Sequence, residues 1–139
     1  MSDFSLSITV DDASDCPTEA RVRSLVDTLF KDQGLAWASI GVVLTDHQAV
    51  LDLNIQWLEH DYHTDVLSFL LEEDPTALEG EVYVDIETAR ERHVEFSTSA
   101  LQEIERYIVH GLLHLAGYDD STDEEKEIMR QLEDQYLLA

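Results

Sequence analysis

The chain has neither the pair of cysteines that a disulfide requires nor the long apolar run that a membrane span requires. Cys16 is its single cysteine, so no intrachain disulfide can form, and this favours a reducing compartment. No stretch reaches the roughly 20 apolar residues that cross a membrane. Residues 1–4 also lack the positive charge that begins a secretory signal. We therefore expect a cytoplasmic protein with no membrane partner.

Basic side chains are scarce as well. The chain has 8 Lys and Arg against 31 Asp and Glu, which gives a formal net charge of −23. Such a balance argues against a broad basic surface for nucleic acid or for an anionic membrane, because both are polyanions. It leaves room for a small, local basic or metal-centred site.

The rest of the composition is that of a globular protein. Apolar residues make up 44% of the 139 residues and charged residues 28%, which is enough to build a real hydrophobic core. Internal repeats, low-complexity tracts and linkers are absent from the sequence. We predict one domain that spans residues 1–139.

Hydrophobic periodicity divides the chain into strands and helices. Alternating or β-branched runs predict four strands, at residues 4–10, 36–44, 64–71 and 80–86. Apolar stripes of helical period predict five helices, which begin near Thr18, Thr45, Glu87, Ser99 and Thr122. On the second helix the stripe includes Val50 and Trp57, and on the last it includes Ile128, Met129 and Tyr136. The order predicts an α+β or α/β fold, a small mixed four-stranded sheet covered by about five helices.

The predicted helix at residues 100–116 carries the most specific chemical pattern, H-x-x-x-H-x-x-G-x-x-D. Residues four apart lie on one helical face, so His110 and His114 can reach one metal ion. Gly117 can end the helix, and the chain can then bend back to offer Asp120 as a third ligand. Two nitrogens, one carboxylate and an open position are typical of a catalytic zinc site. The alternatives are two buried histidines bonded to backbone and a solvated Asp120.

The same spacing occurs in zinc peptidases. Those enzymes place a glutamate directly after the first histidine as general base, and this chain has Gly111 there. A peptidase is therefore disfavoured. At this position a glycine would instead let a strand approach the helix closely.

Three separated motifs resemble the bacterial YbeY family. They are Leu53-Asn54, TDVLSF at residues 64–69, and HGLLHLAGYD at residues 110–119, with the strand after Gly80 between the last two. Met129 and Glu133 also match the family's C-terminal helix. The resemblance covers the chain from about Leu51 to its end. It implies a metal-dependent endoribonuclease of single-stranded rRNA that acts in rRNA maturation and ribosome quality control.

The resemblance also implies a cofactor, partners and ligands. The cofactor would be one zinc ion, with Mn, Ni or Mg as alternatives, and the partners would be rRNA and the ribosome or ribosomal proteins. The ligands would be His110, His114 and Asp120. Asp119 could orient a ligand imidazole or form part of the turn. Thr64, Asp65 and Ser68 lie on the strand that passes near the metal in the family, where they could contact substrate. Otherwise Thr64 and Asp65 cap that strand and Ser68 fills a small space.

Two positions depart from the family pattern. Asp120 stands where the family has a third histidine, and aspartate favours harder ions such as Mn²⁺ or Mg²⁺. Leu58 stands where the family has an arginine, so one cation for the scissile phosphate is missing. An alternative is therefore a ribosome-associated binding protein without catalysis. The sequence assigns no catalytic residue.

Overall fold

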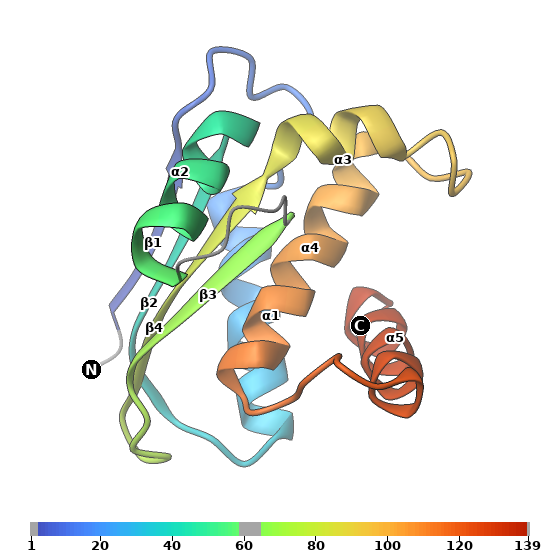
Figure 1. Cartoon of the computed structure of the whole chain (residues 1–139). Coiled ribbons are helices and arrows are strands. Elements are labelled where there is room, and N and C mark those ends of the chain that lie inside the picture. The colour runs from blue at the N-terminus through green and yellow to red at the C-terminus, as the bar shows by residue number, and fades with distance from the viewer. Residues whose placement is uncertain (1–2, 59–64, 139) are drawn as a thin grey trace.

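A computed structural model describes residues 3–58 and 65–138, and it places a mixed sheet between two layers of helices (Figure 1). The described strands lie in the order β1-β2-β4-β3. Strands β1, β2 and β4 are parallel, and β3 runs antiparallel to β4. The strand bounds are β1 Asp3–Ile8, β2 Trp37–Thr45, β3 Val66–Glu72 and β4 Leu78–Asp85. The predicted four-stranded mixed sheet is confirmed.

Five helices accompany the sheet in the described residues, as predicted. Helices α1 and α4 cover one face, α2 covers the other, and α5 packs on the outside of α4 and α1 (Figure 1). Their bounds are α1 Glu19–Asp32, α2 His47–Leu58, α3 Ile86–Arg92, α4 Ala100–Leu115 and α5 Asp123–Leu137. None of the helices in these two described ranges is long and apolar enough to cross a membrane.

Local capping explains where the helices begin. Ser99 and Thr122 each form a capping box, in which the side chain accepts a backbone N–H three residues on. The partner side chains, Gln102 and Glu125, bind back to the cap residue's own N–H. Helix α3 begins one residue earlier than predicted because the Asp85 side chain caps it, accepting from the Thr88 N–H.

The core lies between the sheet and the pair α1 and α4. Its fully buried large side chains include Phe30, Ile40, Leu44, Ile104, Ile108 and Leu112. Several residues predicted on inner faces are instead exposed, among them Trp57 at 63% and Ile128 at 43%. Among the described helices, only α2 covers the face of the sheet opposite α1 and α4. Side chains at the edge of α2, such as Trp57, therefore stay at the surface. Helix α5 buries only a narrow stripe against its neighbours, and Ile128 falls outside it.

Gly111 sets how closely α4 lies on the sheet. A Cβ atom at this position would come within 2.4 Å of a Val82 methyl and 2.9 Å of a Val66 methyl. The Ser68 hydroxyl donates to the Gly111 carbonyl across 2.8 Å. The predicted close approach of strand and helix is therefore present, and it brings one end of β3 beside the two histidines of α4.

Candidate metal centre

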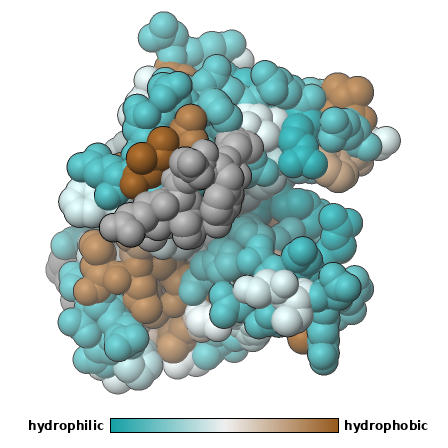
Figure 2. Space-filling model, viewed as in Figure 1, coloured by the Kyte–Doolittle hydropathy of each residue, from teal (hydrophilic) through white to brown (hydrophobic). Residues whose placement is uncertain are grey.

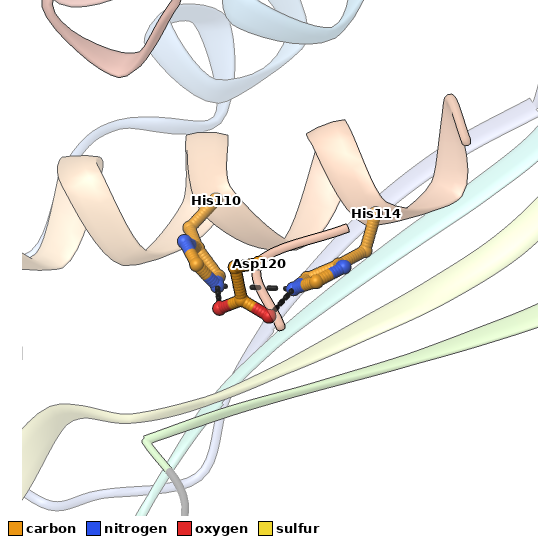
Figure 3. A group of neighbouring side chains, drawn as sticks. All are labelled: His110, His114 and Asp120. Carbon is orange, nitrogen blue, oxygen red and sulfur yellow. Dashed lines mark hydrogen bonds and ion pairs between the residues drawn. The ribbon is translucent and has the colours of Figure 1, made fainter. Parts of the chain in front are cut away.

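Three side chains that the sequence pattern singled out converge at the C-terminal end of α4 (Figure 3). The Nε2 atoms of His110 and His114 lie 3.0 Å apart. Asp120 reaches back from the turn after α4, with carboxylate oxygens 3.2 Å from the His110 Nε2 and 3.7 Å from the His114 Nε2. Two ligands bound tetrahedrally to one zinc ion at 2.0–2.1 Å are about 3.3 Å apart. The three separations bracket that value.

The outer nitrogen of each imidazole is held by an oxygen. The His110 Nδ1 lies 2.8 Å from a Glu133 carboxylate oxygen, and the His114 Nδ1 lies 2.9 Å from the Tyr118 carbonyl oxygen. Both oxygens can only accept from these nitrogens, so each neutral ring carries its proton on Nδ1. A carboxylate or a carbonyl in this position is the usual partner of a metal-ligating histidine.

This tautomer leaves three acceptors facing one another. The two Nε2 lone pairs and the Asp120 carboxylate meet without a donor hydrogen between them. Lone pairs at such distances repel unless a proton on one Nε2 atom or a metal ion lies among them. The donor set therefore fits a metal ion that accepts nitrogen and oxygen ligands.

The two histidines differ in their affinity for a proton. Burial lowers the pKa of His110, but the hydrogen bonds and charges of Glu133 and Asp120 together outweigh this effect and raise the pKa above 6.5. Burial and the neighbouring His110 together lower the pKa of His114 below 6.5. Of the two rings, His114 is therefore the more readily available in the neutral form that binds a metal ion.

The cluster opens into a pocket of about 310 Å³. Tyr107 and Val66 line it beside the three metal-ligand candidates, and so does Asp65, which precedes β3. Burial, followed by the charge of Asp65, raises the pKa of Tyr107. A substrate group next to the metal position would thus meet one carboxylate and one neutral phenol.

The other residues predicted near the site have different surroundings. Ser68 donates to the backbone of α4, which agrees with its alternative role of filling a small space. Asp119 is exposed, and the oxygens that hold the two imidazoles come from Glu133 and Tyr118. Thr64 lies outside the described residues. Leu58 ends α2, and its side chain is outside the described part of the chain.

Sequence reasoning gave Glu133 no role at the site. The residue is 8% exposed on α5, on the side that also buries Met129 and Tyr136. The available signal was the spacing of Glu133, four residues after Met129 and three before Tyr136, which places it on the apolar face of the helix. A buried carboxylate needs a partner, and here a partner is the His110 imidazole. The second oxygen of Glu133 accepts from Arg106 across 3.1 Å.

Comparison with known sequences identifies a group of similar proteins. The family model described as "Endoribonuclease YbeY" matches residues 8–139. A protein named endoribonuclease YbeY from Salinibacter ruber is 48% identical over 126 residues, covering 85% of this chain and 80% of that protein. One of the same name from Amoebophilus asiaticus is 41% identical over 123 residues, covering 88% of this chain and 84% of that protein.

A solved structure has a similar fold. The solution structure of TM1509 from Thermotoga maritima aligns with 96% of this chain and 86% of that chain. The TM-score is 0.63 and the sequence identity is 27%. The arrangement of sheet and helices is therefore shared by two chains whose sequences have diverged widely.

Proposed function

The chain belongs to the YbeY endoribonuclease family, and from this premise we propose that it cleaves single-stranded RNA with a metal ion held by His110, His114 and Asp120. The observation that carries the proposal is the convergence of three acceptor atoms with both Nδ1 atoms turned outward. Without an ion, these contacts require a second proton on His110 that its Nε2 donates to Asp120, whereas one metal ion satisfies all three acceptor atoms at once.

Each residue of the cluster has a defined task in this proposal. Glu133 and the Tyr118 carbonyl fix the two rings so that the Nε2 atoms face the pocket. A bound ion would supply Lewis acidity at the phosphoryl oxygen and would lower the pKa of water beside it. Asp65 lies in the same pocket, where it can contact the ribose or accept a proton.

We further propose that the substrate is rRNA, cut during maturation and quality control of the ribosome in the cytoplasm. The family name and the relatives' names support an RNA substrate. One zinc ion fits the two imidazoles. The Asp120 carboxylate adds negative charge, which shifts the preference toward Mn²⁺ or Mg²⁺ and keeps Ni²⁺ as an alternative.

A second candidate function is that of a ribosome-associated binding protein that does not cleave RNA. The observation in its favour is Leu58, where the family pattern has an arginine. Arginine contributes a bidentate cation to a phosphate, and leucine cannot. The charge of −23 also suits basic ribosomal proteins as partners.

Elemental analysis and RNA cleavage together test the two functions. We expect the purified protein to contain about one metal ion and to cut single-stranded RNA until a chelator is added. His114→Ala should lose both the ion and the cleavage, whereas the control His47→Gln, on α2, should keep both. Cleavage by His114→Ala in chelated buffer would refute the metal-dependent mechanism. A protein that holds metal but leaves RNA intact would favour the binding function.

A further inference from the structure

A second cleft adjoins the metal centre. It has a volume of about 300 Å³ and shares His110, Tyr107 and Asp65 with the metal pocket. This volume is at the lower end of the range of small-molecule sites, about 300–1,000 Å³. Figure 2 shows the molecule notched on this side, between the connection from α3 to α4 and helix α5. Hydrophilic residues line most of the notch, and hydrophobic residues lie at its upper outer edge (Figure 2).

Three arginines line this cleft, Arg92, Arg106 and Arg130, and we call it the arginine cleft. They are three of the chain's 8 basic side chains, against 31 acidic ones. A polyanion such as RNA can bind to so acidic a protein only where basic side chains are concentrated locally. Guanidinium groups gathered beside a metal centre supply such a concentration.

The carboxylates of the arginine cleft are already engaged. Glu103 is 3% exposed and accepts from the Thr98 hydroxyl across 2.9 Å. Glu133 accepts from His110 and from Arg106. Asp65 lies 3.6 Å from the Arg92 guanidinium, a loose ion pair. These carboxylates therefore neutralise Arg106 more completely than they neutralise the other two arginines.

The three arginines thus differ in availability. Arg106 binds Glu133 at 3.1 Å and Asp134 at 2.8 Å, so it is a positioning residue for Glu133. Arg92 has a side chain 44% exposed, and the carboxylates that it meets in the described part of the chain lie at 3.5–3.6 Å. Within residues 3–58 and 65–138, Arg130 forms no ion pair and is exposed. Arg92 and Arg130 can therefore both turn to a phosphate.

An aromatic ring completes the cleft. Phe96 is 45% exposed, and the Arg92 guanidinium lies over its ring, 5.3 Å from the centroid. Tyr107 lines both the arginine cleft and the metal pocket. Exposed aromatic rings beside guanidinium groups bind single-stranded nucleic acid, since bases stack on the rings while the cations follow the backbone.

From these contacts we propose that the arginine cleft binds the nucleotide next to the one being cut, an inference that rests on the proposed function. Arg92 and Arg130 contact its phosphate, and Phe96 stacks on its base. His110 forms part of both the metal centre and the cleft, so one continuous strand reaches both. The arginine cleft then supplies positive charge for the RNA, which position 58 does not supply because it is a leucine and not an arginine.

Binding measured without cleavage tests this proposal. Fluorescence anisotropy of a short labelled single-stranded RNA is recorded with chelator present, across a series of salt concentrations. We expect Arg92→Gln and Arg130→Gln each to weaken binding about fivefold, and to reduce the slope of log K against log salt by about 0.7. Phe96→Ala should weaken binding to RNA about fivefold or more and leave binding to an abasic strand unchanged.

The matched control is Arg23→Gln on α1. Its side chain is 47% exposed and outside the arginine cleft, and it makes the same change in net charge. Equal losses in Arg23→Gln and in the cleft variants would show a non-specific charge effect and overturn the proposal. Wild-type binding by all three cleft variants, or no RNA binding by the wild type at low salt, would overturn it too.

The outcome is separable from the proposed function. If the metal-loaded protein cleaves RNA and the cleft variants bind RNA as well as the wild type does, the proposal for the arginine cleft fails and the endoribonuclease function stands. If those variants bind RNA more weakly and the metal-loaded wild type does not cleave it, the arginine cleft is supported and the endoribonuclease function is refuted.

Discussion

The His110 Nδ1 atom lies 2.8 Å from the Glu133 carboxylate, 23 residues further along the chain. The contact joins α4 to α5, and Arg106 holds the second carboxylate oxygen from the α4 side. The packing of two helices therefore sets the orientation of one imidazole at the candidate metal centre.

Replacing Glu133 by glutamine should weaken metal binding. The amide keeps the shape of the side chain but removes the charge that fixes the His110 ring, and such losses cost about 10- to 100-fold in metal affinity. Competition with a chromophoric chelator measures the change. Asp134→Asn is the control, because Asp134 also binds Arg106 but lies 55% exposed and away from His110. Equal affinities for wild type and Glu133→Gln would contradict the assigned role.

Gly111→Ala should destabilise the protein although alanine favours helices. In an exposed helix this change gains up to about 1 kcal/mol. Here the added methyl would lie 2.4 Å from a Val82 methyl, and overpacking of this kind costs about 1–3 kcal/mol. Urea unfolding measures the free energy, and metal titration should show weaker binding because α4 must move. A variant more stable than wild type would show that α4 tolerates the displacement.

Leu58→Arg should accelerate RNA cleavage. The substitution restores a guanidinium at the position where the family pattern has one, and a cation near the scissile phosphate stabilises the transition state. We expect a gain of about tenfold in the single-turnover rate at saturating metal. Ile55→Arg, at an exposed position of the same helix, makes the identical charge change and should give no comparable gain. Equal rates for the two variants would argue against a phosphate contact at residue 58.

Asp15→Asn should lower stability in a pH-dependent manner. Asp15 forms a two-point ion pair with Arg90, at 2.6 and 2.7 Å, with both side chains mostly buried. The hydrogen bond from Arg90 holds the pKa of Asp15 below its ordinary value of 3.8. Because the folded pKa is the lower one, the stabilisation is fully present above pH 4 and is lost as the pH falls through the folded pKa.

Urea unfolding of wild type and Asp15→Asn at several pH values checks this sign. The difference in unfolding free energy should be about 1 kcal/mol at neutral pH and should shrink in acid. Asp11→Asn, an exposed residue of the same loop, serves as the control. A difference that persists unchanged at low pH would mean that the ion pair is not its source.

Most of the secondary structure was predictable because its signals are local. Ser99 and Thr122 cap helices through partners three residues away, and apolar periodicity marks each buried helical face within a few turns. The same locality made His110 and His114 visible, since residues four apart share a helical face. Trp57 and Ile128 were misplaced because periodicity shows which side of a helix is apolar, and not how much of that side a neighbour covers.

The sequence by itself determined the elements, their order and the histidine spacing, because those depend on residues close together along the chain. Only the tertiary structure decided the sheet order β1-β2-β4-β3, the hydrogen bond from His110 to Glu133, and the meeting of Arg92, Arg106 and Arg130 in one cleft. Those contacts join residues far apart in sequence, and packing against Gly111 and between α4 and α5 selects them. The fold thereby places the candidate metal ligands beside a local group of arginines, which the net charge of −23 does not reveal.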